Sequence, residues 1–186
     1  QSVITLKLAQ TGCVGISEDI IEHRRLMGID LMPEDLEGAT CPYLFPFPAS
    51  PHLAAREAGM QISPERLRCA IDELAGRYQH VVVEGVGGLC VPLTETVTVL
   101  DFVAAARYPT LVVSTPKLGS ISHTLLALEA LKTRDIPIAG VLYNRHIKAP
   151  EAITDDSRAL FRNWLKQHHY PDTVIDLPRV SANTAL

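Results

Sequence analysis

The stretch VVVEGVGGLCVPL at Val81–Leu93 decides the fold, because a wholly apolar run ends at one carboxylate, Glu84, that three glycines follow at once. A short apolar run rich in β-branched residues, without alternation, is typical of a strand that is buried on both faces. Similar runs occur at Val3–Leu8, Leu111–Ser114, Ile138–Leu142 and Val174–Leu177. Strands of this kind occur in parallel sheets that helices cover, so the runs predict a parallel sheet.

Segments with helical periodicity separate the predicted strands. Ser63 can cap a helix that has Pro64 at its first position. Its apolar residues share one face: Leu67, Ala70, Ile71 and Leu74. Further helices are expected at Asp19–Met27, Val97–Arg107, Ser122–Thr133 and Asp156–His168. This alternation predicts a single three-layer α/β domain over residues 1–186, with a mostly parallel sheet and ligands at the carboxyl ends of the strands.

The segment Pro33–Pro51 departs from this alternation. It contains five of the thirteen prolines, together with Tyr43, Phe45 and Phe47, and we expect an irregular loop. The composition favours a packed surface cover, although loops of this length are often functional.

Composition excludes several classes of function. The net charge of −4 and the pI of about 6.0 provide no basic field for nucleic acid or for an acidic membrane surface. No apolar run approaches the roughly 18 residues that span a bilayer, and no signal peptide is recognisable, so we expect a soluble, cytoplasmic protein. The four cysteines are too widely spaced for a structural zinc site, and we expect reduced, mostly packed thiols.

Glu84 is predicted to lie where a parallel strand ends, on the ligand side of the sheet. A carboxylate there needs a cation, hydrogen bonds or solvent, and Mg²⁺ prefers one or two carboxylates with phosphate oxygens and water. Gly85, Gly87 and Gly88 would let backbone N–H groups approach an anionic ligand. A tight turn with an ion-paired glutamate explains the same pattern, and this feature by itself does not decide between the two.

Two further strand ends carry polar residues. Lys7 and Thr11 follow the first strand and could neutralise phosphate and bind a polar substrate, and Asp19 could be a second metal ligand. By themselves, a lysine at a strand end is more often solvated, and Asp19 can simply favour a helix N-terminus. Gly119 and the serines after it, including Ser122, suit a helix cap or an anion site.

In chain order, these pieces resemble the dethiobiotin synthetase family. The matching stretches are KLAQTG at Lys7–Gly12, Asp19, PYLFPFPASPHLAA at Pro42–Ala55, VVVEGVGGLCVPL, KLGSISHTLLALEAL at Lys117–Leu131, GVLYN at Gly140–Asn144, and DLP at Asp176–Pro178. They span nearly the whole chain, and the combination of SPH, EGxGG and LGxIxH is specific. The resemblance implies a P-loop NTPase-like fold, a homodimer, and an Mg²⁺-dependent reaction of ATP, carbon dioxide and diaminopelargonic acid that closes a ureido ring.

The resemblance also implies roles for individual residues. Lys7 and Thr11 would be catalytic, and Asp19 and Glu84 would bind Mg²⁺. The implied substrate-binding residues are Thr11, Ser50, Pro51, Gly87, Gly88 and Ser122. The implied nucleotide-binding residues are Glu84, Gly87, Asn144, Pro178, Arg179 and Val180.

The sequence departs from the family in one large respect. It contains no G-x-x-x-x-G-K-[ST] motif, which the family has upstream of the KLAQTG stretch. Loss of that interior strand would leave unpaired backbone groups that cost about 1–3 kcal/mol each when buried. We therefore expect the chain to be incomplete at its N-terminus, and Gln1 in place of Met agrees. Smaller departures are Leu8, Cys41 and Ser122, where the family commonly has Pro, Asn and Asn.

Two alternative functions stay open on the sequence alone. One is a non-catalytic dimeric relative that binds a small molecule without ATP chemistry, which the absent P-loop favours. The other is a ligase of the cobyrinate-amidating type, which the SPH loop disfavours.

Overall fold

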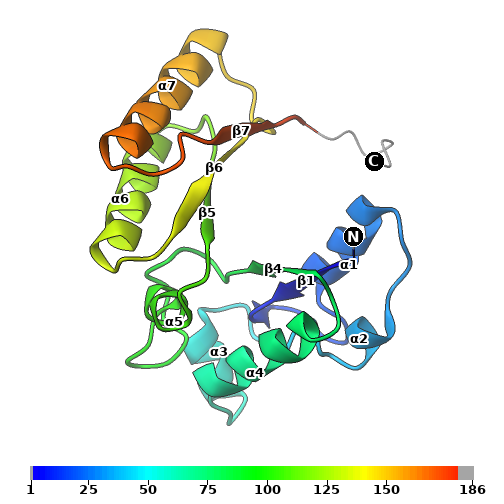
Figure 1. Ribbon diagram of the computed structural model, residues 1–186. Helices are drawn as coiled ribbons and strands as arrows, with labels where there is room; N and C mark the ends of the chain where they lie inside the picture. Colours follow the sequence, from blue (N-terminus) through cyan, green and yellow to red (C-terminus); the bar gives the residue numbers. More distant parts are fainter. Residues whose placement is uncertain (1, 180–186) are drawn as a thin grey trace. The chain divides into compact units, whose positions relative to one another are not determined.

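The computed structural model describes residues 2–179, which form two compact units, residues 2–102 and residues 103–179 (Figure 1). Each unit has its own parallel strands and its own core. Within the described residues, no helix is long and apolar enough to cross a membrane. All four cysteines are free thiols, but the expectation that they are mostly packed is wrong for Cys69 and Cys90, which are exposed. A single domain over residues 1–186 stays a prediction.

In the first unit, strand β1 (Val3–Lys7) pairs in parallel with strand β4 (His80–Glu84). The register places Lys7 opposite Glu84, so both side chains lie at the carboxyl end of the pair. Helix α1 (Glu18–Met27) contacts β1, and helix α4 (Pro64–Ala75) contacts β4. The predicted strand ends therefore meet at one edge, as parallel pairing requires.

Local capping explains where these two helices begin. The Ser17 side chain accepts a hydrogen bond from the backbone N–H of Ile20, and Ser63 accepts one from Arg66 at 3.2 Å. Such caps stabilise a helix by about 0.5–2 kcal/mol. The cap at Ser63 with Pro64 at the first position is confirmed.

The expectation of an irregular loop over Pro33–Pro51 is wrong in part. Helix α2 (Pro33–Leu36) begins at a proline, and strand β3 (Leu44–Phe45) pairs in parallel with strand β2 (Gln10–Thr11). Helix α3 (Pro51–Glu57) follows. The Tyr43 and Phe45 side chains flank Leu44 and are buried, so this segment contributes to the core. Two-residue strands are too short to show a period in the sequence.

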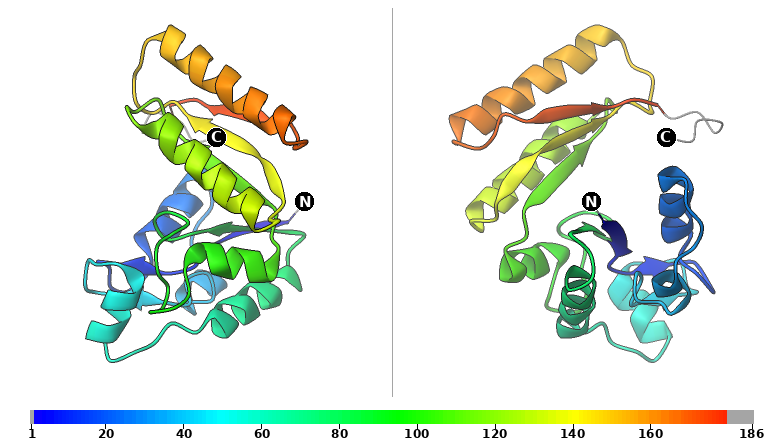
Figure 2. Two further views of the ribbon diagram at one scale, coloured as in Figure 1. Left: turned by 90° about the vertical axis from the view of Figure 1, so that its left-hand side faces the viewer. Right: turned by 45° about the vertical axis from the view of Figure 1, so that its right-hand side comes forward.

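In the second unit, strands β5 (Thr110–Ser114), β6 (Ile138–Asn144) and β7 (Val174–Leu177) form a parallel sheet in that order. Helices α6 (Ser120–Thr133) and α7 (Glu151–Gln167) pack on these strands (Figure 2). Helix α5 (Val99–Ala106) begins in the first unit and ends in the second. The fully buried side chains of the second core are Leu128, Leu131, Val141, Tyr143, Phe161 and Leu165.

Helix α7 begins five residues before its predicted start. In the first turns of this helix, Thr154 and Ser157 face the core, and both are buried. The Ser157 hydroxyl donates to the carbonyl of Ile153 at 2.8 Å, which satisfies it without a partner outside the helix. Because buried hydroxyl residues do not count as apolar, the periodicity does not reveal these turns.

The prediction that the strands are buried on both faces is wrong for several described residues. Alternate side chains of β4 and β5 are exposed, with Val82 at 56% and Val113 at 60%. In the second unit, Val141 and Tyr143 lie on the other face of the sheet and are fully buried. The strands are parallel as expected, but the faces of β4 and β5 that bear Val82 and Val113 are exposed.

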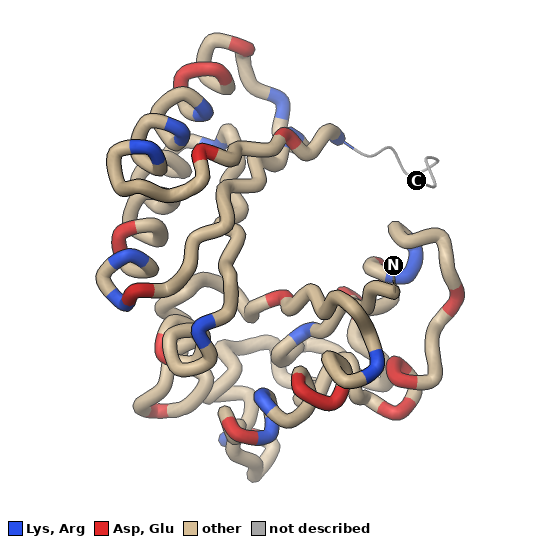
Figure 3. The backbone as a smooth tube through the Cα atoms, in the orientation of Figure 1, with Lys and Arg blue, Asp and Glu red and all other residues tan. Residues whose placement is uncertain are grey.

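Charges of both signs are interspersed along both units (Figure 3). On the helix surfaces they form pairs three residues apart, such as Arg25 with Glu22 on α1 and Lys132 with Glu129 on α6. Solvent screens exposed pairs of this kind, so they contribute little to stability.

Candidate functional site

Lys7 is the centre of a charged cluster in the first unit. Its side chain is only 7% exposed, although it carries an ammonium group. The backbone N–H of Lys7 donates to the Thr40 carbonyl at 2.8 Å, and the next N–H, that of Leu8, donates to the Glu84 carbonyl at 3.0 Å. Both bonds fix the end of β1 and so the direction of the lysine.

The Lys7 ammonium contacts two carboxylates at once. Its Nζ lies 2.7 Å from Asp19 Oδ2 and 2.7 Å from Glu84 Oε1. Because both oxygens contact the same nitrogen, the carboxylates of Asp19 and Glu84 lie close to each other. Asp19 comes from the first turn of α1, and its backbone N–H donates to the Gln10 side chain at 3.2 Å. The structure thus brings together three of the residues that the sequence predicts.

Mutual charge and hydrogen bonding keep Lys7 and Glu84 ionised. Burial lowers the pKa of Lys7, but hydrogen bonds and charge from Asp19 and Glu84 outweigh it, so that the net pKa is raised. The pKa of Glu84 falls to about 2, because a hydrogen bond to His23 and the interactions with Lys7 overcome the opposing effect of burial. At neutral pH, Glu84 therefore presents a full negative charge.

The donor set fits Mg²⁺ as its metal. The side chains of Asp19 and Glu84 are 39% and 45% exposed, so their carboxylates are accessible from solvent. Magnesium commonly takes one or two carboxylates and completes its shell with phosphate oxygens and water. Within residues 2–179, no group of three or more His, Cys, Asp or Glu side chains is arranged for a metal. A cation held by these two carboxylates would thus need further ligands from a substrate or water.

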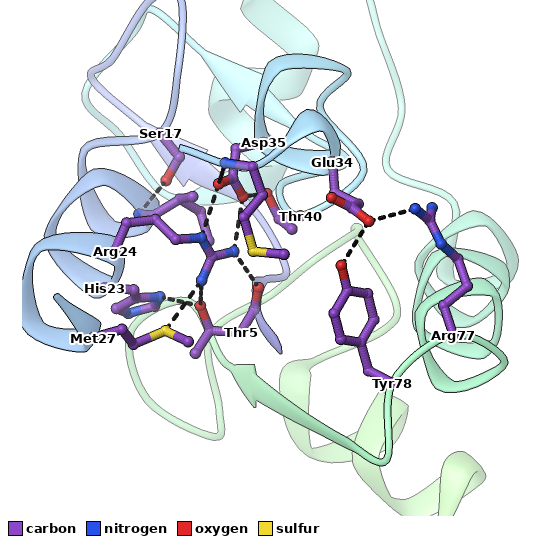
Figure 4. Close-up of polar contacts among 12 residues, drawn as sticks. Thr5, Ser17, His23, Arg24, Met27, Glu34, Asp35, Thr40, Arg77 and Tyr78 are labelled. Atoms are coloured by element: carbon purple, nitrogen blue, oxygen red, sulfur yellow. Dashed lines mark hydrogen bonds and ion pairs between the residues drawn. The ribbon is translucent and has the colours of Figure 1, made fainter. Parts of the chain in front are cut away.

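The sequence does not identify His23 as part of this site. Its Nε2 lies 2.8 Å from Glu84 Oε2, and its Nδ1 lies 2.9 Å from Thr5 Oγ1. Figure 4 shows His23 and Arg24 of α1 directed at Thr5 of β1. His23 is four residues after Asp19, which places both on one face of α1. That spacing is the signal that could have found it.

The other predicted residues of the first unit lie on neighbouring elements. Thr11 ends β2, a strand that contacts α3. Ser50 is the N-cap residue of α3, and Pro51 is its first residue and is buried. Gly87 and Gly88 follow β4, and Gly87 has a φ of 67°, which few residues other than glycine adopt. None of these five contacts the Lys7 cluster through a hydrogen bond or ion pair described by the structure.

The predicted adenine residues lie in the second unit. Asn144 ends β6 opposite Leu177 of β7, and its side-chain oxygen accepts the backbone N–H of His146 at 3.0 Å. Pro178 and Arg179 directly follow Leu177, the residue of β7 that lies opposite Asn144. Val180 lies outside the described residues. Ser122 is exposed in the first turn of α6.

Comparison with known proteins agrees with the resemblance seen in the sequence. A family model described as an AAA domain matches residues 6–171. An ATP-dependent dethiobiotin synthetase of Chlorobaculum tepidum is 51% identical over 94% of this chain and 73% of its own length. Enzymes of the same name from Haemophilus influenzae and Pasteurella multocida are 46% and 40% identical, over 82% and 95% of this chain and 83% and 82% of their own lengths. The chain belongs to this AAA-domain family and, within it, to the ATP-dependent dethiobiotin synthetases.

Proposed function

We propose that this protein is an ATP- and Mg²⁺-dependent dethiobiotin synthetase, a ligase of biotin biosynthesis that forms C–N bonds from diaminopelargonic acid, carbon dioxide and ATP. The observation that carries the proposal is the buried Lys7 ammonium, 2.7 Å from the carboxylates of both Asp19 and Glu84. The names of the relatives favour this function over a non-catalytic binding protein or a cobyrinate-amidating ligase.

The reaction has three balanced steps. One amine of the substrate adds to carbon dioxide and loses a proton, which gives a carbamate. A carbamate oxygen then attacks the γ-phosphorus of ATP, and ADP leaves. The second amine attacks the carbamoyl carbon, which closes the ureido ring with loss of phosphate. The second step brings two anions together, the carbamate and the triphosphate, and the ring closure expels phosphate as the second amine loses a proton, so positioning and charge stabilisation supply most of the catalysis.

We assign the charge stabilisation to the Lys7 cluster. The Lys7 ammonium would balance negative charge on the carbamate and the transferring phosphate. Asp19 and Glu84 would hold Mg²⁺, which when bound stabilises charge on phosphate oxygens as a Lewis acid. Each carboxylate oxygen has two lone pairs, so the bonds that Glu84 accepts from Lys7 and His23 are compatible with a metal contact.

The remaining assignments concern binding. Thr11, Ser50, Pro51, Gly87 and Gly88 would hold the carbamate end of the substrate. Ser122 would contact its tail near the interface of a homodimer, an assembly that sedimentation analysis can test. Glu84 and Gly87 would also contact the nucleotide, and the adenine would contact Asn144, Pro178, Arg179 and Val180. The proximity of Asn144 to the end of β7 supports the last assignment.

The proposed function predicts an ATPase that depends on both cosubstrates. With the full-length protein, ADP formation should require diaminopelargonic acid and bicarbonate together, and carbon from labelled bicarbonate should appear in the ureido carbonyl by NMR. At an Mg²⁺ concentration that just saturates the wild type, Glu84→Gln should strongly reduce both signals, whereas Glu95→Gln, which alters an exposed ion pair with Arg56, should not. ATP turnover that ignores the diamine and bicarbonate would contradict the assignment.

A further inference from the structure

A chain of hydrogen bonds connects a buried ion pair to the proposed metal ligand Glu84. It begins at Arg24 of α1, whose side chain is only 2% exposed although it carries a charge. Arg24 Nε and Nη2 donate to Asp35 Oδ2 and Oδ1, each at 2.8 Å, in a bidentate pair. The Asp35 carboxylate also accepts the Thr40 hydroxyl at 2.7 Å and the Met32 N–H at 2.8 Å. The arginine is therefore held in one orientation.

The chain continues through one hydroxyl and one imidazole. Arg24 Nη1 donates to Thr5 Oγ1 at 2.9 Å. The same Thr5 oxygen lies 2.9 Å from His23 Nδ1, and His23 Nε2 lies 2.8 Å from Glu84 Oε2. Figure 4 shows the first part of this path, with Arg24 and His23 converging on Thr5. The other oxygen of Glu84 faces Lys7.

The chemistry of the groups fixes the two ends of the chain. An ionised carboxylate only accepts hydrogen bonds, so His23 Nε2 must carry a hydrogen toward Glu84. A guanidinium only donates, so the Thr5 hydroxyl oxygen accepts from Arg24. The Thr5 hydroxyl also contacts His23 Nδ1 and therefore links the two ends.

We propose that Thr5 and His23 are positioning residues, which fix the orientation of the Glu84 carboxylate through this chain of hydrogen bonds and thereby set its affinity for a divalent cation. The inference rests on the proposed function of Glu84 as a metal ligand. A glutamate side chain that is 45% exposed has little packing to hold it, so hydrogen bonds must supply the orientation. Groups that orient a metal ligand typically change metal affinity by about 10–100-fold when they are removed.

Two matched pairs of variants separate orientation from mere stability. Thr5→Val removes the hydroxyl and keeps the shape, whereas Thr5→Ser keeps the hydroxyl. His23→Leu removes the donor to Glu84, whereas His23→Gln keeps an N–H that can reach it. Arg25→Gln is the control on the same helix, since Arg25 is paired with Glu22 at the surface.

The readout is the dissociation constant of Mn²⁺ for the full-length protein with ATP, measured by electron paramagnetic resonance well below the melting temperature of each variant. We expect Thr5→Val and His23→Leu to weaken Mn²⁺ binding by about 10-fold or more, and Thr5→Ser, His23→Gln and Arg25→Gln to bind like the wild type. Equal affinity in all folded variants would overturn the proposal.

A spectroscopic measurement on the wild type tests the last link of the chain. In ¹⁵N NMR, His23 should show a protonated Nε2, because this nitrogen donates to the Glu84 carboxylate. A wild-type His23 that is protonated at Nδ1 and not at Nε2 would contradict the proposed contact. If the wild type binds Mn²⁺ with the expected order of variants but does not use the diamine, the proposed reaction fails and the positioning role stands.

Discussion

Lys7 holds a buried positive charge between two carboxylates, and its loss would leave Asp19 and Glu84 close together without a cation. We expect Lys7→Met to lower kcat/KM for ATP by about 100- to 1,000-fold, the range seen when one charge-stabilising donor is removed from an active site. Steady-state ADP release measures this effect. Lys166→Met is the control, because Lys166 is an exposed lysine paired with Asp172. Unchanged kcat/KM in a folded Lys7→Met protein would remove Lys7 from the catalytic machinery.

Glu84→Gln keeps the shape of the side chain and removes its charge. The substituted amide is a weaker ligand for a hard cation, so the Mg²⁺ concentration at half-maximal activity should rise by at least about 10–100-fold, with partial rescue at high Mg²⁺. Titration of activity with Mg²⁺ at saturating ATP measures the change. An unaltered Mg²⁺ dependence would show that Glu84 is not a metal ligand.

At the residue scale, the sequence predicted some partners and missed others for a physical reason. Lys7 and Glu84 follow apolar runs, and parallel pairing brings such strand ends together whatever the details of the register. His23 and Thr5 meet only because α1 packs against β1 at one particular rotation. The sequence predicts the helix, but the packing of the helix on the strand decides which of its residues face the strand.

At the element scale, α2 depends on two neighbouring carboxylates that are buried in the folded protein. Glu34 is 3% exposed, accepts the Tyr78 hydroxyl at 2.7 Å and pairs with Arg77. The Tyr78 hydrogen bond lowers the pKa of Glu34 below its ordinary value of 4.5. For Asp35, burial raises the pKa, but hydrogen bonds from Arg24, Met32 and Thr40 outweigh it, so its pKa lies below 3.8.

These lowered pKa values predict the sign of the pH dependence. A carboxyl group whose pKa is lower when folded contributes stability that is fully present above its ordinary pKa and is lost as the pH falls through its folded pKa. The free energy of unfolding should therefore decline as the pH falls below 4.5, which urea titrations at successive pH values measure. Glu34→Gln should be less stable at neutral pH and show a shallower acid decline. If the free energy of unfolding fell equally steeply with pH in the wild type and in Glu34→Gln, Glu34 would not be a cause of the decline.

Gly140 permits the close approach of β6 to the segment before β7. Its φ is 149°, and a Cβ at this position would lie 2.6 Å from the Thr173 carbonyl oxygen. Backbone strain and overpacking together predict that Gly140→Ala destabilises the protein by about 2–4 kcal/mol, measured by urea denaturation. Gly76→Ala is the matched control, since Gly76 has a negative φ and its added methyl meets only ordinary contacts. Equal stability of the two variants would refute the argument.

At the scale of the whole molecule, the sequence predicted the parallel pairing in both units but not which faces are covered. Apolar runs specify that a strand can be buried on both sides, and they say nothing of which neighbour covers each side. The segment around Tyr43 and Phe45 likewise joins the core through β3, whose two residues carry no detectable period. The prediction that a segment precedes residue 1 stays a prediction, as do the dimer and the roles of the individual site residues.

Binding of ATP with Mg²⁺ should stabilise the folded protein as a whole. A ligand that binds only the native state adds about 2.7 kcal/mol at a concentration of 100 Kd. For a chain of 186 residues this corresponds to a rise in melting temperature of about 5–10 °C. Because Asp19 and Glu84 would hold the metal, removal of Mg²⁺ with EDTA should abolish most of the rise, and Asp19→Asn should reduce it in the presence of Mg²⁺. Differential scanning fluorimetry measures all three conditions. A rise that is the same with and without Mg²⁺ would mean that the nucleotide binds without the metal, and the two carboxylates would then need another role.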